Sequence, residues 1–193
     1  MEMEPLGNLT DEELATRIQK GDSEPLGILM ERYEPKLLRY GRKFLSGGED
    51  IEDIVQEVFL SVYQNIRSYD SSRGFSPWIY RIAHNAFVNE LRKRSRQPVR
   101  FFGFEFDTFV PHPVQEATQV DEQEQMEFKK LLEQGLAKIS PAYSEILILR
   151  YLEELSYQEI ADVLHIPLGT VSVRIARGKK ALEGAYKNLS ITI

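Results

Sequence analysis

Two sets of side chains in this sequence have the types and the spacing to bind nucleic acid. The first set lies on the outward side and the flanks of a helix predicted for residues 170–180, whose inner side is apolar. Its members are Thr170, Ser172, Val173, Arg174, Ala176, Arg177 and Lys180. Cations bind phosphate groups, and short side chains can come close to base edges in a major groove. This set therefore predicts a surface that contacts duplex DNA.

The second set follows a polar loop and lies in residues 69–92. Its members are the aromatic residues Tyr69, Phe75 and Trp78 and the polar residues Arg81, Asn85 and Arg92. Cations hold phosphates and aromatic rings stack on unpaired bases, which is what single-stranded DNA binding needs. Two other interpretations apply: Trp78 as the anchor of a core, and the basic run 92–96 as a helix end stabilised by the helix dipole.

A third set is acidic and lies on a helix predicted for residues 50–66. One side of this helix is a continuous apolar stripe formed by Ile51, Ile54, Val55, Val58 and Val62. The acidic third set itself consists of Asp50, Asp53, Gln56, Glu57, Leu60 and Gln64. A leucine inside an acidic patch suggests a docking surface for a protein with basic side chains. A solvated acidic face with one stray leucine is the equally ordinary alternative.

Catalytic and metal chemistry have little support in this sequence. His84, His112 and His165 are scattered, without partners at catalytic or ligand spacing. The chain has no cysteine, which excludes disulfides and thiolate metal sites. We therefore expect no enzyme activity, no metal and no cofactor.

The first set is positioned by a predicted helix-turn-helix. Ser156 and Glu159 form a capping box that starts a short helix with Ile160, Ala161 and Leu164 on its buried face. After a turn at residues 165–167, a longer helix follows with an inner face that consists of Val171, Ile175, Gly178 and Leu182. The small Ala161 and Gly178 are expected where these two helices cross. An ordinary helical hairpin with a basic face is the alternative.

Periodicity and caps predict further helices in both halves of the chain. Thr10 with Glu13 starts the first helix, which ends at Gly21 and Asp22, and a second helix covers residues 24–45. Its inner side is predicted to be Leu26, Leu29, Met30, Tyr33, Leu37 and Tyr40, and Pro35 is expected to kink or split it. Ser76 is expected to cap a helix that extends to residue 96, with Val88 facing outward. Helices are also predicted at 125–138 and 142–154.

Charge is distributed unevenly along the 193 residues. The net charge is −6, but residues 67–100 carry eight basic and two acidic side chains, and residues 166–193 carry five and one. Residues 1–66 carry seven basic and fourteen acidic ones. Because screening confines each block's field to about 10 Å, two separate contacts with a polyanion are expected.

The pattern predicts an all-α protein with two small helical domains. We expect the first domain at residues 10–96, an extended linker at 97–124 and the second domain at 125–189. The linker lacks helical periodicity and contains three prolines and five phenylalanines, which suggests that it lies against something. No apolar run approaches a membrane span, and the N-terminus does not resemble a secretory signal. These features predict a cytoplasmic protein without membrane insertion.

Three ordered motifs resemble those of bacterial RNA polymerase sigma factors. They are DIEDIVQEVFLSVYQNI, RGFSPWIYRIAHNAFVNELRKR and ISPAYSEILILRYLEELSYQEIADVLHIPLGTVSVRIARGKKAL. Two helical modules joined by a short linker are similar to the small extracytoplasmic-function (ECF, group IV) class of the sigma-70 family. The resemblance implies that the modules are sigma regions 2 and 4, and that the chain directs promoter-specific initiation of transcription.

The resemblance also implies a partner for each of the three sets. The helix at 50–66 would bind the β′ clamp helices of core RNA polymerase, with the β subunit as a further partner. The loop and helix at 69–96 would trap the melted, single-stranded −10 element, with Asn85 holding a flipped-out base. The helix at 170–180 would read the −35 element as duplex. An anti-sigma factor is expected as a further partner.

Two departures and two alternatives accompany this interpretation. Many relatives carry an arginine and a large aromatic where this sequence has Ser172 and Ala176, which reduces base readout by guanidinium. The FFGFEF run of the linker does not match the family pattern. The alternatives are a classical helix-turn-helix regulator, which would not need the second basic block, and a protein–protein adaptor without a DNA role.

Overall fold

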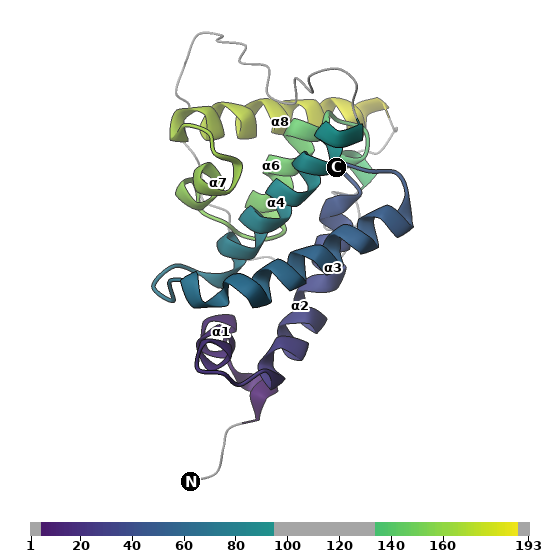
Figure 1. Ribbon diagram of the computed structural model, residues 1–193. Coiled ribbons are helices and arrows are strands. Elements are labelled where there is room, and N and C mark those ends of the chain that lie inside the picture. Colours follow the sequence, from purple (N-terminus) through teal and green to yellow (C-terminus); the bar gives the residue numbers. More distant parts are fainter. Residues whose placement is uncertain (1–4, 95–133, 189–193) are drawn as a thin grey trace. The chain divides into compact units, whose positions relative to one another are not determined.

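The computed structural model describes residues 5–94 and 134–188, which form helices and turns without a strand. The fold class is therefore all-α, as predicted. Figure 1 shows the helices in chain order. They belong to two compact units. Of the described residues, the first unit contains 5–94 and 162–165, and the second contains 134–161 and 166–188.

The first unit is built from four α-helices and two short 3₁₀ turns. They are η1 (Leu6–Asn8), α1 (Asp11–Gln19), α2 (Glu24–Gly41), α3 (Gly48–Asn65), η2 (Ile66–Ser68) and α4 (Phe75–Arg94). The predicted capping box starts α1, since Glu13 N–H donates to Thr10 Oγ1 and Thr10 N–H donates to the Glu13 carboxylate. Gly21, with a φ of 99°, follows α1 in the left-handed conformation that ends many helices.

Of the two expected effects of Pro35, a kink or a split, the split does not occur, because helix α2 continues through this residue. Proline removes one backbone hydrogen bond, which costs about 3 kcal/mol in a helix interior. The buried side chains of Tyr33 and Leu37, on either side of it, hold both halves in the core. Met30 was expected to face inward, but it is 36% exposed because it lies at the edge of the buried stripe.

The core of the first unit contains a group of aromatic rings from α2, the turn that follows it, and α4. The rings of Phe44 and Phe87 are stacked with centroids 5.2 Å apart, and Tyr40 meets Tyr80 edge-on at the same distance. Helix α3 packs against both α2 and α4. The apolar stripe predicted on α3 is buried, as expected: Ile51, Ile54, Val55, Val58 and Val62. This burial decides which side of α3 faces solvent.

Helix α4 begins at Phe75, one residue before the predicted cap Ser76. The N–H of Phe75 donates to Glu12 Oε1 of α1 at 2.9 Å, so the acceptor at this helix start comes from another helix. Val88 was expected to face outward and is buried instead, together with Tyr80, His84 and Phe87. The buried side of α4 is therefore wider than the spacing of the apolar residues in the sequence predicted.

In chain order, residues 134–188 form a short helix that follows one longer helix and precedes another. Residues 134–136 are helical, and α6 (Pro141–Tyr151), α7 (Tyr157–Leu164) and α8 (Leu168–Asn188) follow. The capping box of α7 is present as predicted, with Glu159 N–H donating to Ser156 Oγ and Ser156 N–H donating to the Glu159 carboxylate. His165, in the turn between α7 and α8, has a φ of 52°. The helix-turn-helix predicted here is formed.

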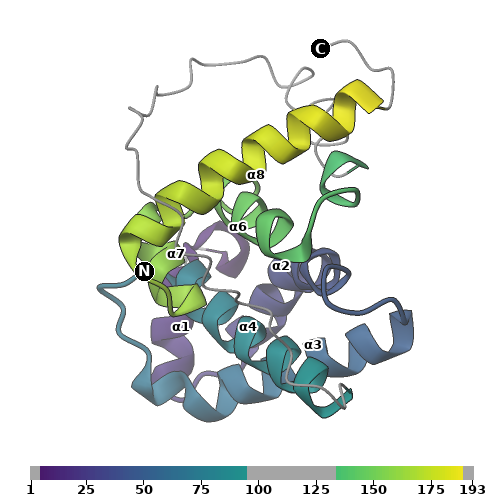
Figure 2. The same cartoon turned by 90° about the horizontal axis from the view of Figure 1, so that it is seen from above.

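Helix α8 packs against α6 (Figure 2). A Cβ atom added to Gly178 would lie 3.2 Å from Leu147 Cγ of α6, so Gly178 permits the approach of α6. The sequence suggested α7 as the neighbour that needs this small residue. Arg150 of α6 donates to the carbonyl oxygen of Leu155 and lies over the Tyr157 ring, which ties α6 to the start of α7.

Some predictions fall outside the described residues. They are the linker with its phenylalanines, the basic residues beyond Arg94, and the start of the helix predicted from residue 125. Within residues 5–94 and 134–188, no helix combines the length and the apolar character that a membrane span requires.

Candidate polymerase and nucleic-acid interfaces

The solvent side of α3 combines exposed apolar and acidic groups. Leu60 is 57% exposed, and the predicted Asp53, Gln56, Glu57 and Gln64 are exposed around it. Tyr63, which is 50% exposed, lies one turn after Leu60 on the same side. Tyr63 was not among the predicted residues, although its spacing from Leu60 places it there. We call Asp53, Gln56, Glu57, Leu60, Tyr63 and Gln64 the α3 face.

Asp50 has a different environment from the α3 face. Its carboxylate forms an ion pair with Arg94 Nη1 of α4 at 2.7 Å, and Arg94 Nε donates to Glu90 at the same distance. The hydrogen bond from Arg94 Nη1 lowers the pKa of Asp50, and the separate hydrogen bond from Arg94 Nε lowers the pKa of Glu90. Asp50 thus connects α3 to the end of α4, a contact that the sequence did not indicate.

The loop between η2 and α4 is closed by its own hydrogen bonds. Asp70 accepts from the N–H and the hydroxyl of Ser72, which lowers the pKa of the Asp70 carboxyl. Arg73 N–H donates to the Asp70 carbonyl oxygen. The hydroxyl of Tyr69 donates to the Arg73 carbonyl oxygen at 2.7 Å. These bonds leave Ser71, Ser72 and Arg73 exposed at the tip. We call residues 69–74 the α4 loop.

The three aromatic residues of the second set lie in the interior. Tyr69, Phe75 and Trp78 are 4%, 0% and 9% exposed, and their ring centroids lie 5.1–5.7 Å from one another. Rings packed in this way offer no free face to an unpaired base. In this structure their burial favours the core-anchor interpretation of Trp78 over stacking on DNA. Burial of their apolar surface stabilises the position of the loop and of the start of α4.

The polar residues of the second set reach the surface. Asn85 and Arg92 are exposed and Arg81 is half-buried, along the same side of α4. Within the described residues, Arg92 Nη1 makes a long contact of 3.5 Å to Asn89 Oδ1. Cationic and amide groups are thus available on the helix that follows the α4 loop.

Helix α8 presents the first set over its N-terminal half. Ala176 and Lys180 are exposed, while Thr170, Ser172, Val173, Arg174 and Arg177 are half-buried. Burial lowers the pKa of Arg174, and the nearby Glu145 opposes that shift. Val171 and Ile175 are buried, as predicted, which turns the set away from the core. Arg174 therefore has a packing role besides any contact with DNA.

The histidines do not gather into a site. His84 is buried in α4 and His165 lies exposed in the turn after α7, while His112 is outside the described residues. Among the described residues, no three histidine, aspartate or glutamate side chains are placed to hold a metal ion.

Two family descriptions match this chain at the places where these surfaces lie. Sigma-70 region 2 matches residues 29–97, which include α3, the α4 loop and α4. Sigma-70 region 4 matches residues 129–182, which include α6, α7 and most of α8. The two matches have the order and the spacing that the resemblance implied.

Curated relatives match nearly the whole chain. The ECF RNA polymerase sigma factor SigW of Bacillus subtilis is 32% identical over 177 residues, which cover 90% of this chain and 95% of the relative. The ECF RNA polymerase sigma-E factor of Escherichia coli K12 is 30% identical over 185 residues, 94% and 96% of the two chains.

Solved structures of two proteins share the fold. CnrH, solved in complex with the cytosolic domain of CnrY, has a TM-score of 0.63 at 22% identity and covers 92% of this chain and 97% of its own. The sigma factor RpoE, solved with the anti-sigma factor NepR from Bartonella quintana, has a TM-score of 0.58 at 23% identity, with coverage of 82% and 94%. With both family matches in order and relatives at 30% identity or more along its length, the chain belongs to the sigma-70 family, as an ECF RNA polymerase sigma factor that directs promoter-specific initiation of transcription.

Proposed function

We propose that the α3 face is the surface by which this sigma factor binds core RNA polymerase, at the β′ clamp helices. The observation that carries this proposal is the contrast between the two sides of α3. One side is a complete buried stripe, and the other exposes Leu60 and Tyr63 among acidic groups. Exposed large apolar side chains surrounded by charge are typical of protein interaction sites. Acidic groups around them favour a partner with basic side chains.

The α4 loop and the exposed side of α4 are proposed to contact the melted −10 element. Asn85 can offer both a donor and an acceptor to an unstacked base, and Arg92 and Arg81 can hold the phosphates. The buried aromatic residues support this function indirectly, because they fasten the loop from which the contacts start.

Helix α8 is proposed to read the −35 element as duplex. Its N-terminal residues Ser172, Val173 and Ala176 would lie near base edges, and Arg177 and Lys180 would lie near the backbone. Because these base-proximal side chains are short, part of the discrimination would come from groove shape.

The remaining partners and the location are also proposals. The β subunit is a further polymerase contact, and an anti-sigma factor is a regulatory partner. The similarity in fold to RpoE, solved with NepR, is consistent with the latter. We further propose that the protein works in the cytoplasm, without a cofactor and without catalytic activity of its own. A helix-turn-helix regulator or an adaptor would leave the region 2 match unexplained.

Core binding by single variants of the α3 face tests the main proposal. Leu60→Ala and Tyr63→Ala should each weaken binding to core polymerase by about 1–3 kcal/mol, since central, desolvated side chains dominate interface energies. Met30→Ala is the matched control, because Met30 is also exposed but lies on α2. Titration of labelled protein with core enzyme measures the Kd. Wild-type affinity in both folded α3 variants would refute the assignment of this face.

A further inference from the structure

Helix α1 holds the α4 loop at its beginning. The Gln19 side-chain amide, at the end of α1, donates through Nε2 to two carbonyl oxygens, those of Ile66 at 2.8 Å and Tyr69 at 2.7 Å. Ile66 is the first residue of η2, and Tyr69 is the first residue of the loop. One side chain thus donates to two backbone carbonyl oxygens at the point where the chain leaves η2.

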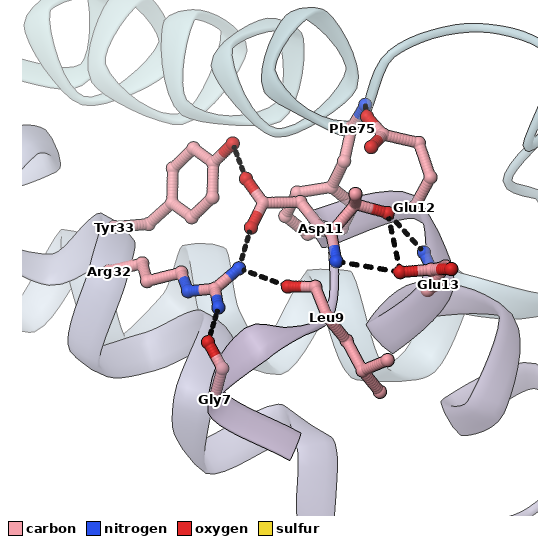
Figure 3. A network of polar contacts seen from close by, with 9 residues as sticks. Gly7, Leu9, Asp11, Glu12, Glu13, Arg32, Tyr33 and Phe75 are labelled. Atoms are coloured by element: carbon pink, nitrogen blue, oxygen red, sulfur yellow. Dashed lines mark hydrogen bonds and ion pairs between the residues drawn. The ribbon is translucent and has the colours of Figure 1, made fainter. Parts of the chain in front are cut away.

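The same helix holds the other end of the loop. Glu12 Oε1 accepts from the N–H of Phe75, the first residue of α4, at 2.9 Å (Figure 3). The first N–H groups of a helix lack partners within it, and a carboxylate at that end is also favoured by the helix dipole. Burial, and then the negative charge of Glu12, raise the pKa of the Tyr69 phenol.

Helix α1 is itself fastened to α2. The Arg32 guanidinium donates to the carbonyl oxygens of Gly7 and Leu9 and pairs with Asp11 at 2.6 Å (Figure 3). The hydroxyl of Tyr33 donates to the other oxygen of Asp11 at 2.6 Å. This network holds the start of α1 against α2. The helix that carries Glu12 and Gln19 is therefore fixed in position. The network also lies largely before residue 29, where the region 2 match begins.

We propose that Glu12 and Gln19 are positioning residues for −10 recognition, because they clamp both ends of the α4 loop in the conformation that meets DNA. The inference rests on the proposed function of the loop. A loop that is ordered before binding does not have to lose conformational freedom in the complex, so preorganisation raises affinity without adding a contact. Removing the clamp should therefore weaken DNA binding even though neither residue is one of the predicted DNA contacts.

Two variants remove the clamp and two test whether the effect is specific. Gln19→Leu deletes both donors at similar size, and Glu12→Ala deletes the acceptor at the start of α4. Glu12→Gln keeps a side-chain oxygen that can accept from Phe75, so it should restore binding. Glu13→Ala weakens the capping box of α1 without touching the loop, and it controls for a general loss of helix stability.

The experiment measures the Kd of the complete holoenzyme for a fork-junction promoter fragment with a single-stranded −10 element. Gln19→Leu and Glu12→Ala should weaken this binding about three- to tenfold, as expected for one or two lost hydrogen bonds. The affinity of all four variants for core polymerase should stay at the wild-type value. The affinity of the Glu12→Gln and Glu13→Ala holoenzymes for the fork-junction fragment should also stay close to the wild-type value. Hydrogen exchange in the free protein should be faster at the amides of residues 69–75 in the first two variants only.

Asn85→Ala separates a failure of this inference from a failure of the proposed function. If Asn85→Ala weakens fork binding while Gln19→Leu and Glu12→Ala do not, the clamp is refuted and the −10 assignment stands. If none of the three variants weakens fork binding, the −10 assignment is refuted as well. Equal losses in Glu13→Ala and Glu12→Ala would also overturn the inference, because general destabilisation of α1 would then explain both.

Discussion

At the scale of single residues, the partner of a side chain decides its role more than its type does. Asp50 and Asp53 are both carboxylates near the start of α3, but Asp50 is paired with Arg94 of α4 while Asp53 belongs to the exposed α3 face. A paired carboxylate is less available to a partner protein, because binding must first break the existing contact. We therefore assign Asp50 to the connection between α3 and α4 and no longer to the core-binding surface.

This assignment predicts a pH dependence for Asp50→Asn. Arg94 lowers the pKa of Asp50 below its ordinary value of 3.8 in the folded protein, so the pair stabilises the fold above pH 3.8. That contribution is lost as pH falls through the lowered pKa. The difference in unfolding free energy between wild type and Asp50→Asn should be small but measurable at pH 7 and should vanish in acid, as followed by urea denaturation. Asp53→Asn is the control and should leave this dependence intact.

At the scale of elements, the closest contacts between helices depend on where the chain has glycine, which lacks a side chain. A Cβ atom at Gly41, the last residue of α2, would lie 2.5 Å from Phe87 Cζ of α4 and 2.6 Å from Ile51 Cγ2 of α3. Those distances are far inside van der Waals contact, so α2 can approach both helices only with glycine there. Gly27, in the same helix, has no atom within 4 Å of such a Cβ.

The two glycines of α2 predict opposite effects of the same substitution. Gly41→Ala should destabilise the first unit by about 1–3 kcal/mol, because overpacking a core forces its neighbours to shift. Gly27→Ala should stabilise it by about 0.5–1 kcal/mol, since alanine loses less backbone entropy in a helix than glycine does. Denaturant midpoints of the two variants, compared with wild type, provide the measurement. A Gly41→Ala variant as stable as wild type would mean that the three helices do not meet at this point.

At the scale of the whole molecule, the two basic blocks of a chain with net charge −6 fall in different units. Asn85 and Arg92 lie in the first unit, and Arg177 and Lys180 lie in the second. The acidic remainder discourages general attraction to DNA, so promoter binding should depend on these two local surfaces acting on two DNA elements. Contacts made by separate surfaces are expected to contribute independently.

The double variant Asn85→Ala/Lys180→Ala tests this independence. Its loss of promoter binding free energy in holoenzyme should equal the sum of the single losses within about 0.5 kcal/mol. Lys180→Ala alone should lower the slope of log K against log salt by about one, because one phosphate contact is lost, and Asn85→Ala should leave the slope unchanged. Binding titrations at several salt concentrations give both quantities. An interaction free energy above about 1 kcal/mol would show that the two surfaces are coupled.

Features that arise within one or two helical turns could be predicted from the sequence. The capping boxes at Thr10 and Ser156 are local, because each joins residues three positions apart. The stripe on α3 follows from a helical repeat, which also placed Leu60 and its acidic neighbours on the solvent side. The order of the three motifs along the chain was sufficient to identify the family.

Only the tertiary structure decided the contacts between residues far apart in the chain. Gln19 meets Tyr69 fifty positions later, and Glu12 meets Phe75 sixty-three positions later, so no local spacing reveals either contact. The aromatic residues at 69, 75 and 78 illustrate the same limit, since rings that suit base stacking suit a core equally well. Which of the two they do depends on how the helices around them assemble, and the free energy of burying their area settles it in favour of the core.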